Sequence, residues 1–525
     1  MTERAHGGLD MGTDTEFGRP DFWPVRPIQA TVGWSRPGAA RRYGDRHDVR
    51  YADQERSTRN VQLSTFNGVS ERAVGGRDMG TDTKFRVFNR NKQAGLDRSR
   101  GNGHADRAML DKPVLFDSLT RQLPEAIDLL RQMVEINSWT ENRAGVNKLG
   151  DLTAEVFAQL GFKSEKVPSE NPAWGDHLVL IRNGSSSANV AMVSHLDTVF
   201  PPDEEELNNF RWQIEGDRIY GPGTHDIKGG TVMMWLVLRT IRELMPGVFD
   251  RLGWRLFLNS SEETTSHDFG RVCRHRFDKN TIAALVFESE GRRGEVRRLV
   301  VARKGRATWR VTVTGRGAHA GGRHPQGANA IVELGLVVQR ISSFTDYSRD
   351  LTFNVGLIRG GGGLNRVPHL AVAEGELRAF RADVFEEAKL ALLALGGPGE
   401  VRSPADGFPC NIDIEFLSET APWPRNPATD ALLEVWRRAA TKLGIEVEGE
   451  ERGGLSDGNL LWRAVPTIDG LGPHGENDHC SERSPDGSKV PEYVEISSFV
   501  PKAALNVLAI GFLAGQSGGL AETTV

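Results

Sequence analysis

The sequence is poor in residues and patterns that would place it in several specialised classes of protein. It holds three cysteines in 525 residues, Cys273, Cys410 and Cys480, which are widely spaced and odd in number. They do not form a disulfide framework, so a reducing compartment is expected. No run of 18 consecutive apolar residues occurs, and no methionine near the start precedes the apolar segment of a signal peptide. We therefore expect a cytoplasmic protein that binds no membrane.

A large excess of charge of one sign is also missing. The chain carries 65 basic and 70 acidic side chains, a net charge of -5. Proteins that bind nucleic acids concentrate Lys and Arg in a stripe or patch, and no such stripe occurs after residue 112. We therefore expect no nucleic-acid partner. With 38% hydrophobic and 26% charged residues, the composition is typical of a globular protein of two or three domains.

The first 112 residues lack the periodicity of helices and strands. They are rich in Gly, Arg, Asp and Asn, which predicts a disordered extension. Within it, residues 3–17 recur at 71–85 with identity at 12 of 15 positions. Two copies are too few for a solenoid of stacked repeats. The duplication is interpreted as a repeated linker or as the result of a wrongly assigned start codon, with Met109 as the expected start, and a docking peptide is the alternative.

From residue 113 the sequence predicts an α/β fold. Short apolar runs at residues 178–181, 190–194, 254–258 and 284–287 alternate with helical segments, as in a mainly parallel sheet covered on both faces. Residues 304–419 instead predict a βαββαβ unit, a small α+β domain inserted into the first. The main domain is then discontinuous, formed by residues 113–303 and 420–525.

Acidic and imidazole side chains follow the predicted strands of the main domain. In open α/β sheets sites form beyond the carboxyl ends of parallel strands, so these side chains are expected to meet. A hydrolytic metal centre needs imidazole and carboxylate ligands, and one free carboxylate that takes a proton from water. The side chains concerned are His195, Asp197, Asp226, Glu262, Glu263 and Glu288.

The spacing of these residues suggests a role for each. His195 is a metal ligand, and Asp197, two residues on, lies behind the imidazole and fixes its tautomer. Asp226, in a glycine-rich turn before a helix, bridges two metals. Neighbouring side chains point in different directions, so Glu263 can bind a metal while Glu262 acts as the general base.

Together the motifs resemble the co-catalytic zinc peptidase family that contains glutamate carboxypeptidase (carboxypeptidase G), aminoacylases and acetylornithine deacetylase. The similarity covers about residues 115–515, and Tyr-Val-Glu-Ile-Ser at 493–497 is most similar to glutamate carboxypeptidase. The other motifs are His-Leu-Asp-Thr-Val (195–199), Tyr-Gly-Pro-Gly-x-x-Asp-x-Lys-Gly-Gly (220–230), Glu-Glu (262–263), Phe-Glu (287–288), Gly-Ala-His-Ala-Gly (317–321) and Gly-Gly-x-Ser-Asp (453–457).

The resemblance implies two Zn²⁺ ions, or Co²⁺ or Mn²⁺ in their place. The first metal is then held by His195, Asp226 and Glu288. The second metal is held by Asp226, Glu263 and His479. Glu290 is the alternative to Glu288, and His474 is the alternative to His479.

The resemblance also assigns roles to the inserted domain, which becomes a lid and dimerisation domain of a homodimer. His319 reaches a neighbouring active site and stabilises the oxyanion. Arg378 binds the α-carboxylate of the substrate, a task suited to a guanidinium. Asn365 and Gly454 lie near the oxyanion or the carboxylate.

The implied activity is that of a metal-dependent carboxypeptidase, which hydrolyses a C-terminal amino acid, with glutamate as the candidate, from a small peptide or N-acyl conjugate. An N-acyl amino acid deacylase is the alternative within the family. A catalytically silent binding protein with this fold is a second alternative, and the intact Glu262 argues against it.

Overall fold

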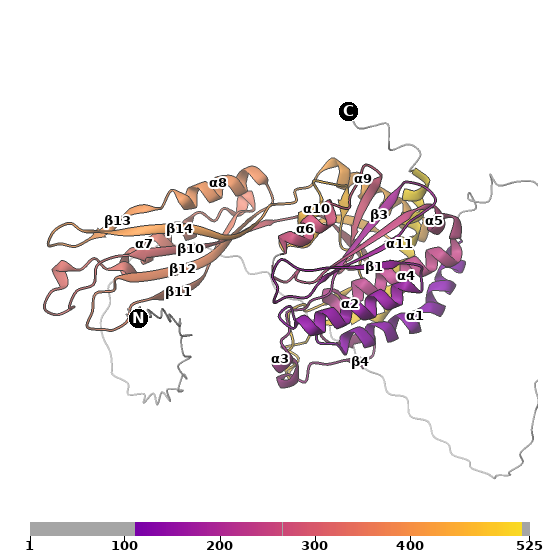
Figure 1. The fold of residues 1–525 in the computed structure, drawn as a ribbon, viewed down its shortest axis with the longest axis horizontal. Coiled ribbons are helices and arrows are strands. Elements are labelled where there is room, and N and C mark those ends of the chain that lie inside the picture. Colours follow the sequence, from indigo (N-terminus) through magenta and orange to yellow (C-terminus); the bar gives the residue numbers. More distant parts are fainter. Residues whose placement is uncertain (1–110, 265, 517–525) are drawn as a thin grey trace, which may run out of the picture. The chain divides into compact units, whose positions relative to one another are not determined.

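The computed structural model describes residues 111–516 with the exception of Thr265 (Figure 1). The predicted disordered extension and its duplicated segment lie outside the described residues, apart from the last two positions, where helix α1 begins.

A six-stranded sheet forms the centre of the main domain, in the order β1-β2-β6-β3-β7-β16. Strands β6, β3, β7 and β16 pair in parallel, and β1 and β2 extend the sheet in antiparallel fashion. Strand β3 is buried at every position, which explains its continuous apolar run in the sequence. The bounds are β1 Lys163–Val167, β2 His177–Arg182, β3 Asn189–His195, β6 Gly253–Asn259, β7 Thr281–Val286 and β16 Thr467–Ile468.

Helices cover both faces of this sheet, as the sequence predicts. Val190 and Met192 of β3 lie in one core with α1, α4, α9 and α11, whereas Ala191 and Val193 pack in another with α6 and α10. Successive strand residues point to opposite faces, so one strand supplies both cores. The bounds are α1 Lys112–Val134, α2 Arg143–Ala158, α3 Pro202–Leu207, α4 Gly229–Leu244, α5 Pro246–Arg251, α6 His267–Arg274, α9 Pro427–Leu443, α10 Gly458–Leu461 and α11 Ile496–Gln516.

Helix α11 is long and apolar enough to cross a membrane by length and hydropathy alone. Here it is a core helix. Asn506 accepts a hydrogen bond from Trp436 of α9, with 3.0 Å between indole Nε1 and Oδ1, and Lys502 donates to the carbonyl of Gly470 over 2.7 Å. These polar contacts suit the interior of a folded domain better than lipid.

Two small sheets that the sequence did not predict flank the main one. They have the orders β15-β9-β8 and β17-β18-β5-β4. The segment Tyr493–Glu495, directly before helix α11, pairs with β5, and Tyr493 packs on Tyr220 at 5.6 Å between ring centroids. The bounds are β4 Gln213–Glu215, β5 Arg218–Tyr220, β8 Gly291–Arg293, β9 Val296–Arg303, β15 Val447–Arg452, β17 Gly475–Glu476 and β18 Tyr493–Glu495.

Residues 305–420 form a five-stranded antiparallel sheet, and Figure 1 shows its strands side by side in the order β11-β12-β10-β14-β13. Trp309 and Val311 of β10 pack on helices α7 and α8, whereas Arg310 points to the other face. Strand β13 is an additional edge strand that the predicted βαββαβ unit lacks. The sequence did not indicate it, because its first residues, Gly-Pro-Gly, are typical of a turn. The bounds are β10 Gly305–Thr314, α7 Ala330–Ser343, β11 Thr352–Gly360, β12 Leu370–Ala379, α8 Ala382–Leu393, β13 Gly397–Arg402 and β14 Pro409–Thr420.

Two glycines test the packing of this sheet. A Cβ at Gly375 of β12 lies 2.1 Å from the carbonyl oxygen of Asn354 and 2.4 Å from Cζ2 of Trp309, whereas a Cβ at Gly335 of α7 meets nothing within 4 Å. We expect Gly375→Ala to lower the free energy of unfolding by about 1–3 kcal/mol. Gly335→Ala should raise it by about 0.5–1 kcal/mol, because alanine favours a helix more than glycine. Urea unfolding of both variants measures these free energies. Equal changes in the two variants would contradict the close contacts described at Gly375.

Candidate metal centre

Loops from separate parts of the chain meet at one edge of the six-stranded sheet. His195 closes β3, Glu263 follows β6 and Glu288 follows β7. These three strands are parallel neighbours, so their carboxyl ends lie together. Asp226 comes from the kinked turn Thr224–Lys228 directly before α4, and its own backbone angles, φ -119° and ψ 95°, are not helical. His479 comes from the loop between β17 and β18.

Asp226 lies between two imidazoles. Its Oδ1 is 3.0 Å from Nε2 of His195, and its Oδ2 is 3.3 Å from Nε2 of His479. The same His479 nitrogen is 3.3 Å from Oε2 of Glu263, and the His195 nitrogen is 3.9 Å from Oε1 of Glu288. The structure thus brings the five sequence-predicted ligands together, in two groups that share Asp226.

The two alternative ligands have other contacts. Glu290 is buried in an ion cluster, with Oε1 3.0 Å from the ammonium of Lys502 and Oε2 paired with Arg297. His474 contacts the carbonyl of Glu290 through Nδ1 at 3.2 Å. Both carboxylate oxygens of Glu290 and Nδ1 of His474 therefore have partners other than the residues around Asp226.

The electrostatics of this cluster are those of a cation site. Burial and the negative charge of Asp226 raise the pKa of Glu263 to about 7, and burial raises the pKa of Glu288 well above its ordinary range. Hydrogen bonds to Asp226 and Glu263 raise the pKa of His479 to about 11. Burial alone would raise the pKa of Asp226, yet hydrogen bonds from His195 and His479 lower it. In the protein without a metal, protons on the carboxyl groups and the positive charge of the imidazoles thus stabilise the cluster.

The residues fit a metal. Ligand atoms of His195, Asp226 and Glu263 lie within 4.8 Å of one another. Oε1 of Glu263 is buried and has no hydrogen-bond partner among the described residues. Imidazole nitrogen with carboxylate oxygen is a ligand set that suits zinc and similar divalent ions.

Asp197 does more than the sequence predicts. His195 Nδ1 lies 3.0 Å from the backbone carbonyl oxygen of Asp197 and 3.5 Å from its carboxylate, so the carbonyl is the closer partner of the imidazole. The carboxylate instead accepts the backbone amides of Glu262 and Glu263, at 3.0 and 3.2 Å, and the hydroxyl of Thr140 at 2.7 Å. It therefore fixes the backbone that carries both glutamates.

Glu492 is a functional residue that sequence reasoning missed. One oxygen of its buried carboxylate accepts the amides of His225 and Asp226, at 2.8 and 3.1 Å. Burial raises its pKa to about 8. Glu492 thus holds the turn of Asp226 as Asp197 holds the glutamate loop. No ligand-like spacing marks it in the sequence, because it acts on the backbone alone.

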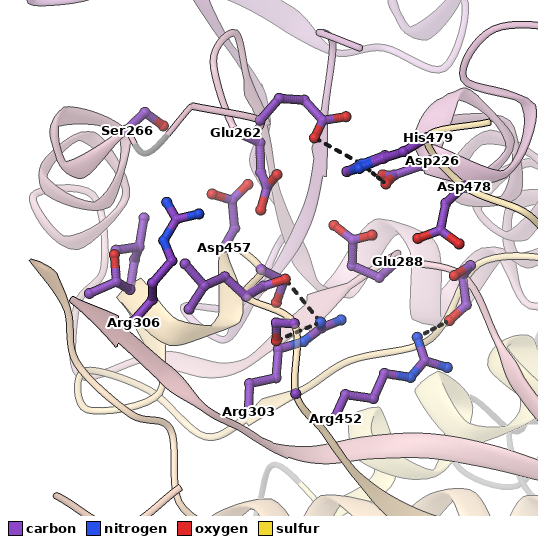
Figure 2. A pocket seen from close by; sticks show the side chains of 18 of the residues that line it. Asp226, Glu262, Ser266, Glu288, Arg303, Arg306, Arg452, Asp457, Asp478 and His479 are labelled. Carbon is purple, nitrogen blue, oxygen red and sulfur yellow. Dashed lines mark hydrogen bonds and ion pairs between the residues drawn. The ribbon is translucent and has the colours of Figure 1, made fainter. Parts of the chain in front are cut away.

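A cavity of about 430 Å³ opens beside the cluster and includes Glu262 in its wall. Figure 2 shows Glu262, Glu288 and Asp457 facing this space. Burial raises the pKa of Glu262 well above its ordinary range and that of Asp457 to about 7. Asp457, which sequence reasoning left without a role, accepts a hydrogen bond from Asn259 over 2.8 Å. The sequence feature that could have identified Asp457 is the Gly-Gly-x-Ser-Asp motif, of which it is the last residue.

Four arginines line the same cavity: Arg303, Arg306, Arg378 and Arg452. Arg378, one of the predicted substrate-binding residues, donates from Nε and Nη2 to Glu376 at 2.8 and 3.1 Å, and from Nη1 to the carbonyl of Gly453 at 3.1 Å. The predicted Gly454 also lies in the wall. A basic wall therefore stands opposite the acidic cluster.

The predicted residues His319 and Asn365 lie outside the wall of this cavity. The backbone carbonyl of Asn365 accepts the amide of Ala320 over 2.9 Å, and the nearby His319 is exposed. The loop of Asn365 pairs with the loop of His319 through a bridge between His319 and Arg366, and the predicted place of Asn365 near the oxyanion or the carboxylate stays a prediction.

Comparisons with known proteins agree with this geometry. The sequence pattern of Peptidase family M20/M25/M40 matches residues 191–498. Carboxypeptidase G2 of Pseudomonas sp. (strain RS-16) is 27% identical over 392 residues, which cover 73% of this chain and 88% of that protein. Succinyl-diaminopimelate desuccinylase of Bordetella pertussis is 28% identical over 390 residues, 71% of this chain and 94% of the other.

Solved structures share the fold. Aminopeptidase PepT from Bacillus cereus has a TM-score of 0.58 at 20% identity, and covers 75% of this chain and 99% of its own. The YXEP protein of Bacillus subtilis, described as a dinuclear metal-binding peptidase from the M20 family, has a TM-score of 0.53 at 12% identity, with coverage of 75% and 99%. The predicted α/β fold class is confirmed.

The metal-free protein should lose stability as the pH rises. Glu263 and Asp457 have ordinary pKa values of 4.5 and 3.8, and both are raised to about 7 in the folded protein. Their contribution is therefore complete below the ordinary values and is lost as the pH rises through 7. A bound cation replaces the lost protons, so zinc should raise the unfolding midpoint more at about pH 8 than at about pH 5.

Thermal unfolding with a chelator and with zinc across that pH range measures the effect. Glu263→Gln removes one of the two carboxyls and should flatten the pH dependence of the metal-free protein. Parallel curves with and without zinc would contradict the assignment of this cluster as the metal site.

Proposed function

This chain belongs to peptidase family M20/M25/M40, a family of hydrolases that act on peptide or amide bonds, and on that basis we propose that it is a two-metal carboxypeptidase. The substrate is a small peptide or an N-acyl conjugate that ends in a free, acidic amino acid, with glutamate as the candidate. Carboxypeptidase G2, which is 27% identical, supports the carboxypeptidase class.

The observation that carries this proposal is Asp226 held between His195 and His479, with a further carboxylate, Glu262, at the cavity wall. A binding protein has no use for that further carboxylate beside two ligand groups. A hydrolase needs it as the base.

In the proposal, two metals would be held by the two ligand groups that share Asp226. The first group consists of His195, Asp226 and Glu288, and the second consists of Asp226, Glu263 and His479. Zinc suits these ligands, with Co²⁺ or Mn²⁺ as substitutes. When bound, the metals supply positive charge that polarises the scissile carbonyl and makes a water molecule more acidic.

Glu262 moves the proton. Its carboxylate takes a proton from the attacking water and delivers it to the nitrogen of the leaving amine. Burial raises its pKa well above the ordinary value of 4.5, and a carboxyl with a raised pKa holds the proton that it passes on as a general acid. Asp197 aims this carboxylate through the amide that it holds.

His319 of the partner subunit is proposed to donate to the developing oxyanion. In this chain, Nδ1 of His319 accepts the amides of Gly321 and Gly322, at 3.2 and 3.0 Å. The proton then lies on Nε2, which makes Nε2 the donor. This assignment requires the homodimer expected from the lid domain, because His319 does not line the cavity of its own chain.

The alternative is an N-acyl amino acid deacylase. The similarity to a desuccinylase favours it. Both activities release an amino acid with a free carboxylate, and they differ in the group on the other side of the amide bond.

A substrate panel decides between these functions. Zinc-loaded protein should hydrolyse peptides and N-acyl conjugates that end in glutamate with the highest kcat/KM, because the cavity wall carries arginines for the carboxylates. A preference set by a small acyl group, whatever the C-terminal residue, identifies a deacylase. If nothing in the panel is hydrolysed, the binding-protein alternative stands.

Glu262→Ala should separate catalysis from metal binding. We expect kcat to fall by roughly 10²–10⁴-fold, because the proton carrier is lost. Both metals should remain, as measured by elemental analysis after gel filtration. Glu263→Ala is the matched control and should lose metal. If Glu262→Ala loses metal instead, the roles of the two glutamates are exchanged.

Mixing two inactive variants tests the role of His319. Glu262→Ala and His319→Ala subunits, unfolded together and refolded at equal amounts, should regain about a quarter of wild-type activity, since half the dimers then carry one complete site. Each variant refolded alone is the control. No recovery from a dimeric mixture would show that His319 does not act across subunits.

A further inference from the structure

Two arginines stand directly opposite each other on neighbouring strands of the cavity wall. Arg306 of β10 pairs with Arg378 of β12 in antiparallel register, and both line the cavity that contains Glu262. Directly opposed residues on antiparallel strands have Cβ atoms about 5 Å apart, and like charges in these positions destabilise the sheet. A sequence that keeps such a pair in a cavity breaks a local rule, as functional sites do.

The surroundings of Arg306 favour an anion. Its side chain is half-buried, and burial together with the positive charge of Arg378 lowers its pKa. A bound carboxylate would offset both effects, because it brings negative charge to a partly desolvated guanidinium. Figure 2 shows Arg306 beside Asp457 and Glu262, on the side of the cavity where the proposed base lies.

The other two arginines of the wall have structural contacts. Arg303 donates from Nε to Asp469 over 2.7 Å and from Nη1 to the carbonyl of Leu455 over 2.9 Å. Arg452 donates to Glu450 over 2.6 Å and to the carbonyl of Ser289 over 2.9 Å. Both hold loops of the wall in place. Arg378 also has contacts, with Glu376 and Gly453, but Arg306 and Arg378 differ from the other two in standing in register on adjacent strands of the wall, where two guanidiniums can bind one ligand together.

We propose that Arg306 determines specificity by binding the side-chain carboxylate of an acidic C-terminal residue, while Arg378 binds the α-carboxylate. The inference rests on the proposed carboxypeptidase function. Two guanidiniums on adjacent strands suit a ligand with two carboxylates joined by a short carbon chain, and each carboxylate can accept a pair of N–H bonds. A neutral C-terminal residue leaves Arg306 without this contact.

The test compares two peptides that differ only in a C-terminal glutamate or glutamine. In Arg306→Gln, we expect kcat/KM for the glutamate peptide to fall roughly 10- to 100-fold, the value of a hydrogen-bonded charge pair. The glutamine peptide should change little. Arg306→Lys keeps the positive charge and should recover part of the loss. Arg310→Gln is the matched control, because Arg310 lies on the same face of β10 and is paired with Glu374 and Glu415 outside the cavity.

A binding measurement separates this inference from the proposed function. Calorimetry with zinc-loaded protein should show that free L-glutamate binds more tightly than L-glutamine, and that Arg306→Gln removes the difference. This result decides the role of Arg306 even if no peptide is hydrolysed. A lack of hydrolysis would contradict the carboxypeptidase proposal and leave the role of Arg306 in binding unaffected.

Several outcomes overturn the inference while the carboxypeptidase function stands. An equal loss on both peptides makes Arg306 a general contact or a structural residue. Unchanged discrimination in Arg306→Gln, or a wild-type protein that treats the two peptides alike in rate and binding, shows that another group binds the side chain.

Discussion

Mutual repulsion among buried carboxylates is the constraint on which this site depends. Asp226, Glu262, Glu263, Glu288 and Asp457 converge on one cavity, and burial raises the pKa of four of them. Such a cluster is unfavourable unless positive charge enters it. The imidazoles of His195 and His479 provide part of that charge. The arrangement of the ligand atoms suits a metal cation, which would provide the rest. The parallel sheet imposes the crowding, because its strands end together.

The cavity divides into two electrostatic halves. The acidic half is built on strand ends of the main domain, and the basic half includes Arg306 and Arg378 from β10 and β12. An amide substrate with a free carboxylate matches this division, since its carboxylate and its scissile bond need opposite surroundings. In the proposed function the arginines orient the substrate, while the acidic half performs the chemistry.

The sequence predicts what depends on pattern and misses what depends on backbone contacts. Strands β3, β6 and β7 are recognisable as buried apolar runs, and the side chains after them, such as His195 and Glu288, follow from the architecture of parallel sheets. Glu492 could not be found in this way, because a carboxylate that accepts two backbone amides leaves no spacing rule behind. Arg306 was missed for a related reason, since its partner in register, Arg378, lies 72 positions away and only strand pairing brings them together.

Asp197 and Glu492 each accept hydrogen bonds from two consecutive backbone amides, which matters for the protein before it binds metal. The peptide segments that carry Glu262, Glu263 and Asp226 are anchored by protein carboxylates rather than by the ions themselves. The protein's own hydrogen bonds therefore favour the arrangement of these segments before any ion binds.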